Sequence, residues 1–141
     1  MISGLSLDEA AKLHGHKGPW LVLGYKAGLR ANEVLKPNTE HDLFCRAYTP
    51  LKTPYTCALD GIQASTRCTL GKLSIEVVKS EVNEIKFVFL DKRTGRKLEV
   101  KLKEGVASLI EEMISKRGLS EAAKAIEDEE TCELFEEKLY D

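Results

Sequence analysis

The sequence predicts a single α+β domain in which a mostly antiparallel sheet packs against helices. Apolar residues recur at spacings of three and four in the first and last parts of the chain, whereas in the middle they alternate with polar residues. The first pattern indicates helices and the second indicates strands. Helices followed by strands and then by helices are typical of α+β folds, and 141 residues suit one domain with its own core.

The composition excludes several classes of protein. Apolar residues make up 43% of the chain and charged residues 31%, which indicates a folded globular protein. A net charge of -2 provides no broad basic field, so general nucleic-acid binding is disfavoured. No apolar run approaches the ~20 residues that span a bilayer, and the N-terminus has no cleavable leader pattern. We therefore expect a cytoplasmic protein that binds neither nucleic acid nor membrane.

The N-terminal part predicts two helices joined by a tight turn. Ser6 and Glu9 form a capping-box pattern, so a short helix should begin after Ser6 and end near Leu13. A longer helix should start at Pro19 and stop before Pro37. We take this second helix as the central helix of the core, because it carries small residues that would let a neighbour approach closely: Gly24, Ala27, Gly28 and Ala31.

The middle of the chain predicts four strands and one helix. The first strand should cover residues 43–48, and a helix should run from Cys57 to about Thr66. Alternating apolar residues then predict strands around 73–77, 85–89 and 98–102. The last two strands should form a hairpin, because only a polar turn separates them.

The C-terminal part predicts helices only. Apolar residues from Val106 onward form a helical stripe that ends near Gly118. Ser120 can cap a further acidic helical region reaching Leu139, with a break at 127–130.

The first candidate site is the turn His14-Gly15-His16-Lys17-Gly18-Pro19-Trp20, which holds two of the three histidines. Imidazole nitrogens in such a loop can bind a metal or carry a proton, next to the free N–H groups of a helix start. His14 could equally interact with the carbonyl end of the first helix, and either histidine could orient the other. We take His16 as the first ligand candidate of the pair and His14 as the second. The remaining histidine, His41, should lie at the surface.

The second candidate segment covers residues 57–72 and supplies Cys57, Cys68, Asp60 and Gln63. Zinc prefers imidazole and thiolate ligands, so this segment and the His turn could together form one site. The four cysteines show no Cys-x-x-Cys spacing, which favours free thiols or metal ligands over disulfides. We expect Cys45 in the core and no site role for Cys132.

Together the two segments resemble the core domain of the FmdE family, named for a component of formylmethanofuran dehydrogenase, without its C-terminal zinc ribbon. That family carries a His-Gly-His-x-Cys-Pro-Gly turn followed by a Gly-Tyr helix, and later Cys-x-x-Asp-Ala-Ile-Gln followed by Gly-Cys-Thr-x-Gly-Lys-Gly-Asn. The matching positions are His14-Gly15-His16, Pro19, Gly24-Tyr25, Cys57, Asp60, Ile62-Gln63, Cys68-Thr69 and Gly71-Lys72. The resemblance predicts an FmdE-like core over residues 1–117, with a helical extension of residues 118–141 packed on it.

The resemblance implies a homodimer that holds a divalent metal, zinc first and iron second, near the two motifs. The implied metal ligands are His16, Cys57, Cys68 and His14, and the implied cofactor-binding residues are Asp60, Gln63 and Lys72. The implied partners are subunits of the molybdenum or tungsten enzyme that makes formylmethanofuran in methanogenic and related archaea. The chain departs from the family at Gly18, which replaces the cysteine of the turn and removes a candidate ligand.

Three functions remain open from the sequence. The leading hypothesis is an FmdE-like metal-binding protein acting beside formylmethanofuran dehydrogenase or in related one-carbon redox metabolism, as a metal-dependent accessory to that oxidoreductase. The second is a metal-free structural or accessory dimeric subunit, because the turn thiol is missing. The third is a thiol-redox protein using Cys57 and Cys68, which requires a thiol of low pKa. The sequence assigns no catalytic residue.

Overall fold

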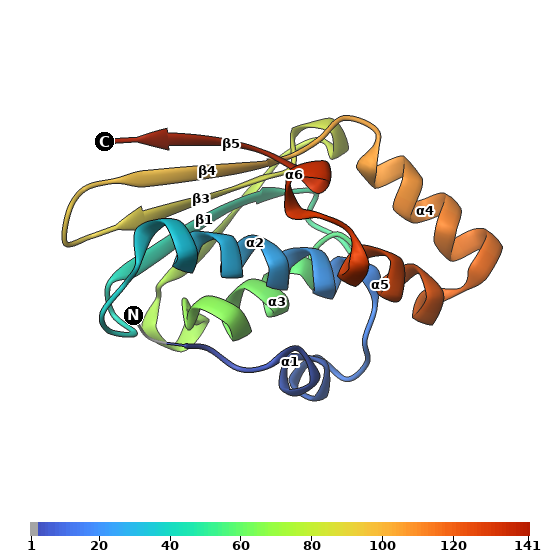
Figure 1. The fold of residues 1–141 in the computed structure, drawn as a ribbon, viewed down its shortest axis with the longest axis horizontal. Helices are drawn as coiled ribbons and strands as arrows, with labels where there is room; N and C mark the ends of the chain where they lie inside the picture. The colour runs from blue at the N-terminus through green and yellow to red at the C-terminus, as the bar shows by residue number, and fades with distance from the viewer. Residues whose placement is uncertain (1–2) are drawn as a thin grey trace.

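Helices cover one face of a five-stranded sheet in the computed structural model, which describes residues 3–141 (Figure 1). This arrangement confirms the predicted α+β class. The strands are β1 (Leu43–Thr49), β2 (Ile75–Lys79), β3 (Lys86–Asp91), β4 (Lys97–Leu102) and β5 (Phe135–Tyr140). The helices are α1 (Leu7–His14), α2 (Pro19–Leu35), α3 (Cys57–Thr66), α4 (Val106–Arg117), α5 (Leu119–Asp128) and α6 (Thr131–Leu134), with short 3-10 turns η1 (Leu70–Lys72) and η2 (Val82–Glu84).

The sheet is mostly antiparallel, as the sequence predicts. Its strand order is β2-β1-β3-β4-β5, in which β1 and β2 are parallel and the other three pairs are antiparallel. Phe87 and Phe89 of β3 are fully buried on the helix side, whereas Val88 between them is half-buried on the other side. The core therefore lies between the helix layer and one face of the sheet.

The two N-terminal helices follow their local sequence signals. Ser6 Oγ accepts a hydrogen bond from the Glu9 backbone at 3.1 Å, and the Glu9 side chain accepts one from the Ser6 backbone at 2.9 Å. This reciprocal cap confirms the predicted start of α1. Helix α1 ends at His14, one residue beyond the predicted Leu13, and α2 begins at Pro19 as predicted. No helix within residues 3–141 has both the length and the apolar character needed to cross a bilayer.

The central helix α2 packs very closely against α3, which confirms the interpretation of its small residues. A Cβ atom added at Gly24 would overlap the Ala58 backbone, and one added at Gly61 would overlap the Leu21 carbonyl oxygen. Each helix therefore presents a glycine to the backbone of the other. This contact holds the start of α3 close to the start of α2, where the His turn lies.

The predicted C-terminal helical region is wrong from residue 135 onward: residues 131–134 form the short helix α6, and the chain then continues as a strand. Gly118, rather than Ser120, is the N-cap of α5, and α5 ends at Asp128 in the predicted break. Residues Phe135–Tyr140 form β5, which pairs with β4 along its whole length. Without β5, one side of β4 would have no neighbouring strand. Pairing with β5 satisfies the backbone N–H and C=O groups on that side, and local helix propensity does not include this energy. The Glu and Lys residues of this segment therefore lie in a strand.

A buried ion pair at the end of β3 predicts a pH-dependent stability. The Asp91 side chain is fully buried and accepts hydrogen bonds from the Arg93 backbone at 2.9 Å and from its Nη2 at 3.0 Å. Burial raises the pKa of this carboxyl, but the Arg93 hydrogen bonds and charge outweigh it, so the net pKa lies below 3.8. A lowered folded-state pKa stabilises the protein at pH values above the unfolded pKa, and this stabilisation is lost as the pH falls through the folded pKa.

We expect Asp91→Asn to lower the free energy of unfolding at neutral pH by about 1 to 3 kcal/mol. The difference from wild type should shrink as the pH falls below about 4 toward the lowered folded-state pKa of Asp91, because the unfolded chain then binds a proton that the folded carboxylate does not. Urea unfolding at pH 7 and at pH 3 measures both effects. The exposed Asp128 provides the control, since Asp128→Asn should change stability little at either pH. A stability difference for Asp91→Asn that stays constant with pH would contradict this account.

Candidate functional site

The His turn lies at the junction of α1 and α2. His14 is the last residue of α1, and Gly15 follows it in the left-handed conformation, with φ of 113°. Gly18 is the N-cap of α2, and Pro19 occupies the first helical position. The turn therefore places His14 and His16 beside the free N–H groups at the start of α2.

His14 is held by Asp60, which lies in the first turn of α3. The His14 Nδ1 and Asp60 Oδ2 atoms are 2.6 Å apart, and the His14 side chain is only 11% exposed. His14 Nε2 is buried and has no hydrogen-bond partner among the residues that the structure describes. With Nδ1–H donating to the carboxylate, Nε2 carries a free lone pair, which is the form in which histidine binds metals or accepts protons.

His16 lies beside His14 and is more exposed. The two ring centroids are 4.9 Å apart with an interplanar angle of 44°. A Cβ atom added at Gly18 would lie 3.4 Å from His16 Nε2 and would meet no other described residue within 4 Å. The position where the FmdE pattern has a cysteine is therefore directly beside the His16 ring.

Gln63 continues the polar network from Asp60 toward the η1 loop. Its Nε2 lies 3.4 Å from Asp60 Oδ1, and its Oε1 accepts a hydrogen bond from the Leu70 backbone at 3.0 Å. One carboxylate oxygen of Asp60 therefore contacts the His14 ring, and the other contacts the Gln63 amide. These contacts fix the orientation of the carboxylate and, through it, of the His14 ring.

Cys57 is the first residue of α3, one helical turn before Asp60, and is half-buried. Burial raises the pKa of its thiol, and the negative charge of Asp60 raises it further. The neutral thiol is therefore favoured at neutral pH. A metal at this position would have to displace a proton from the sulfur.

Cys68 and Lys72 lie beyond the other end of α3. The ten residues of α3 separate its ends by about 14 Å. Cys68 is buried and its Sγ donates to the Leu43 carbonyl oxygen at 3.4 Å, while Lys72 Nζ donates to Arg67 O at 2.5 Å and Thr69 Oγ1 at 2.8 Å. The structure thus brings His14 and His16 to Asp60 in the first half of α3, with Cys57 one turn before Asp60 and Gln63 one turn after it, and leaves Cys68 and Lys72 beyond the C-terminal end of the helix.

This separation gives no support to a thiol pair. A disulfide between Cys57 and Cys68 would need Cα atoms within about 7 Å. Burial also raises the pKa of Cys68, so neither thiol has the low pKa of a reactive cysteine. Cys45 is fully buried in the core, as predicted, and Cys132 and His41 are exposed.

Within residues 3–141, no three His, Cys, Asp or Glu side chains are gathered in a metal-binding arrangement. Two imidazoles with an orienting carboxylate are in place, and Gly18 occupies the position where a third donor would stand. The donors that are present therefore suit a divalent metal but make an incomplete ligand set.

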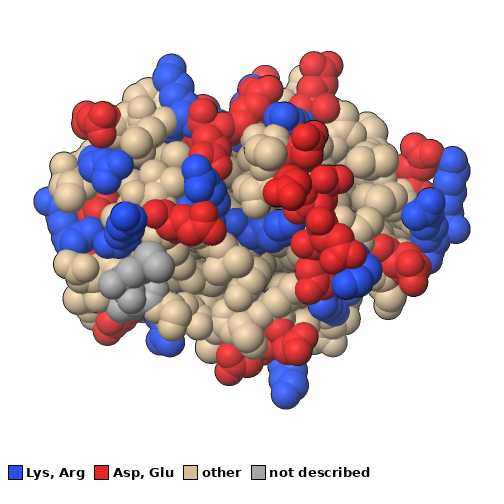
Figure 2. All heavy atoms as spheres, in the orientation of Figure 1, with Lys and Arg blue, Asp and Glu red and all other residues tan. Residues whose placement is uncertain are grey.

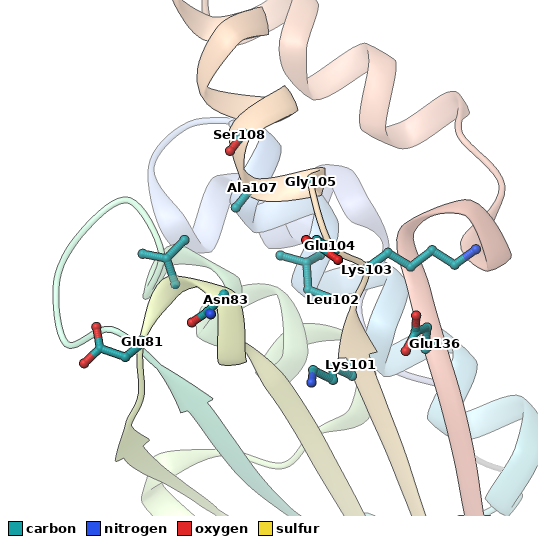
Figure 3. A pocket seen from close by; sticks show the side chains of 11 residues that line it. Glu81, Asn83, Lys101, Leu102, Lys103, Glu104, Gly105, Ala107, Ser108 and Glu136 are labelled. Atoms are coloured by element: carbon teal, nitrogen blue, oxygen red, sulfur yellow. The ribbon is translucent and has the colours of Figure 1, made fainter.

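A cavity of about 820 Å³ lies apart from the His turn (Figure 3). It opens between η2, the end of β4 and the first turn of α4, with Glu136 of β5 at one side. None of the site residues that the sequence predicts lines this cavity. Its walls mix Lys101 and Lys103 with three glutamates, so it has no clear preference for an anion or a cation.

One residue of the His turn contacts a segment that the sequence does not connect with it. Lys17 pairs with Glu127 of α5 at 2.7 Å, whereas the pattern of the turn indicates only a solvated charge. Acidic side chains gather over the end of α5 and over α6, as Figure 2 shows. The two residues are too far apart in sequence for any local signal to reveal the contact.

Two comparisons with known proteins give a match to this chain, one with a family model and one with a solved structure. The family model described as FmdE, molybdenum formylmethanofuran dehydrogenase operon, matches residues 13–140. A crystal structure from Syntrophus aciditrophicus, of a tungsten formylmethanofuran dehydrogenase FmdE-like protein, superposes with a TM-score of 0.57 at 18% sequence identity. That alignment covers 99% of this chain and 77% of the other, and it shows a shared fold. A search of curated proteins finds no match. Because the family model spans nearly all of the sequence, this chain belongs to the FmdE family.

Proposed function

We propose that this protein is a cytoplasmic accessory of formylmethanofuran dehydrogenase, or of a related one-carbon redox enzyme, and that its His turn binds a divalent metal. Family membership supports the first part, because the family is described by the formylmethanofuran dehydrogenase operon. The observation that carries the second part is the buried, unpartnered Nε2 of His14, with Asp60 on its other nitrogen.

The roles of the individual residues follow from their contacts. His14 and His16 would bind the metal, and Asp60 would hold the His14 ring in the orientation that presents Nε2 to it. Cys57 is the nearest thiol by position in α3, and Gln63 keeps Asp60 in place. When bound, zinc or iron would supply Lewis-acid activation of a water or a carbonyl group.

Metal titrations of purified protein test this function. Wild-type protein should bind Zn²⁺ or Co²⁺ stoichiometrically, and His14→Ala and His16→Ala should each abolish the high-affinity phase in isothermal titration calorimetry. Asp60→Asn should weaken binding by about 10- to 100-fold. His41→Ala is the matched control, since His41 is exposed and lies outside the turn. If wild-type protein binds no more metal than the double variant of His14 and His16, the metal-binding function is wrong.

Gly18→Cys should restore the missing ligand and tighten zinc binding by roughly tenfold or more. Gly18 has an extended backbone, with φ of -110° and ψ of 168°, which any residue adopts. The new Cβ would make ordinary contact with His16 Nε2, so the thiol would lie beside the imidazoles. Calorimetry with Zn²⁺ and the thiolate-to-metal absorption band with Co²⁺ measure the effect. Gly18→Ala, which adds the Cβ without the sulfur, is the control; equal affinities for the two variants would contradict this geometry.

The second candidate function is a metal-free accessory subunit, which the glycine at position 18 favours. In that case His14 and Asp60 would only lock α1 onto α3. His14→Ala would then lower the melting temperature, while added metal would leave the stability of wild-type protein unchanged. Stabilisation by Zn²⁺ that is lost in His16→Ala would decide for the metal-binding function.

A further inference from the structure

Gly18 leaves room beside the imidazoles of the His turn. Its backbone is extended, a conformation that any residue adopts, so the turn does not require glycine at this position. A Cβ atom added there would lie 3.4 Å from His16 Nε2 and 3.5 Å from His16 Cδ2, and these are its only contacts within 4 Å among the described residues. What glycine provides is therefore space, and that space borders a candidate metal-binding nitrogen.

The space beside Gly18 suits a small ligand. Gly18 is buried, whereas the neighbouring His16 is exposed. Exposed side chains change rotamer readily, so His16 can move to admit a ligand. A position that lies beneath one mobile side chain admits a molecule of a few heavy atoms more easily than it admits a residue on the surface of another folded protein.

The charges around the His turn favour an anionic ligand. Histidine binds metals as the neutral imidazole, so His14 and His16 leave the charge of a divalent ion uncompensated. The two carboxylate oxygens of Asp60 contact His14 and Gln63 instead. The first turn of α2 contains no acidic residue, and no side chain caps it. Its free N–H groups therefore also favour negative charge beside Gly18.

Among anionic donors, a thiolate matches these neighbours best. Zinc is bound in proteins by imidazole nitrogen and thiolate sulfur together. The thiols of the chain itself do not complete this set, because within residues 3–141 neither Cys57 nor another cysteine forms a group of three metal-binding side chains with the two histidines. A thiol from solution supplies the sulfur without such a constraint, and its S–H proton passes to solvent as the sulfur–metal bond forms.

We propose that the thiolate of a low-molecular-weight thiol completes the ligand set of the His turn, with its sulfur in the space that Gly18 leaves beside His16 Nε2. This inference rests on the proposed metal binding and adds the chemical class of the ligand. The thiol and the metal then bind cooperatively, and each raises the affinity for the other by the same factor. Neither partner is oxidised or reduced.

Cobalt spectroscopy under anaerobic conditions tests this inference, with 2-mercaptoethanol as the thiol. Cobalt-loaded wild-type protein should show no thiolate-to-metal absorption band by itself, and the band should appear when 2-mercaptoethanol is added. Saturating thiol should tighten cobalt binding by roughly tenfold or more in calorimetry, after correction for cobalt bound by free thiol. Ethylene glycol, which has a hydroxyl in place of the thiol, and 2-(methylthio)ethanol, which cannot ionise, should produce neither effect.

Three variants locate the sulfur. His16→Ala should lose the band, and His41→Ala should keep it, because His41 lies outside the turn. Gly18→Cys should show the band without added thiol, and 2-mercaptoethanol should then change neither the band nor the affinity, because the new side chain occupies the same space. Circular dichroism confirms that the variants are folded.

Three results would overturn the inference while leaving metal binding intact. Cobalt binding that is equal with and without 2-mercaptoethanol, with no band in either case, would reject a thiol ligand. A band that wild-type protein shows without added thiol, and that Cys57→Ser loses, would assign the sulfur to the chain itself. A full response to 2-mercaptoethanol in Gly18→Cys would place the thiol elsewhere. Absence of cobalt binding under every condition would instead reject the proposed metal-binding function, and this inference with it.

Discussion

Gly61→Ala should lower the free energy of unfolding by about 3 kcal/mol or more. The added methyl group would overlap the Leu21 carbonyl oxygen and crowd the Tyr25 backbone nitrogen, so α3 would have to move away from α2. Backbone atoms cannot rotate aside as the end of a flexible side chain can. Because the α2 and α3 helices form the centre of the helix layer, the displacement should weaken the whole core. Thermal and urea unfolding measure the loss.

Gly71→Ala is the control for this substitution. Gly71 lies in η1, and a Cβ atom added there would meet nothing within 4 Å among the described residues. Its substitution should change the stability by no more than about 1 kcal/mol. If Gly61→Ala is as stable as Gly71→Ala, the close packing of α2 on α3 does not exist in solution. His14 should also be affected in Gly61→Ala, because moving α3 separates Asp60 from the His turn; zinc affinity should then fall together with stability.

Lys26→Met should have the second-largest effect, lowering the free energy of unfolding by about 2 to 4 kcal/mol. Lys26 lies in α2 and is half-buried, and its Nζ donates to the carbonyl oxygens of Ile126 at 3.0 Å, Glu127 at 3.1 Å and also Glu129. Ile126 and Glu127 lie in the last turn of α5 and Glu129 directly follows it, where a helix leaves most carbonyl oxygens without intrahelical partners. Burial lowers the pKa of Lys26, although the surrounding acidic residues oppose this. The charged amino group therefore joins the C-terminal segment to the core.

Methionine preserves the length and packing of the Lys26 side chain and removes only its charge and donors. Lys124→Met is the matched control, because Lys124 is exposed on α5 and pairs with Asp128 in the next turn of the same helix. That substitution should change the stability little, because the pair is exposed to solvent. Amide hydrogen exchange gives a second measurement: in Lys26→Met, residues of α5 should lose protection before those of α2. Equal stability of the two variants would show that the carbonyl contacts add nothing.

The sequence predicted those helices and strands whose start, end or burial pattern is set by residues close together in the chain. The capping box of Ser6 and Glu9, the prolines at positions 19 and 37, and the alternation on β3 and β4 each act within a few residues. The helix from Cys57 to Thr66 was predicted with its observed ends. The segment that failed was Phe135–Tyr140, because its structure depends on β4, which lies more than thirty residues earlier in the chain.

The candidate site was predicted in part. The sequence selected His14, His16, Asp60 and Gln63, and the structure places them in one network: His16 lies beside His14, His14 contacts Asp60, and Asp60 contacts Gln63. It also selected Cys68, which the length of α3 separates from Cys57. Spacing along the chain could not reveal this separation, because the turn after Thr66 directs Cys68 into the core beside Leu43.

The sequence by itself determined the types and limits of most elements, the close approach of helices that glycine permits, and the family. These depend on interactions between residues that are neighbours in the chain or that share one helix face. Only the tertiary structure decided which reactive side chains meet, that Lys26 and Lys17 hold the C-terminal segment, and that one face of the sheet is left open. Those features join residues tens of positions apart, and their energies arise only when the chain has folded and brought the partners within contact distance.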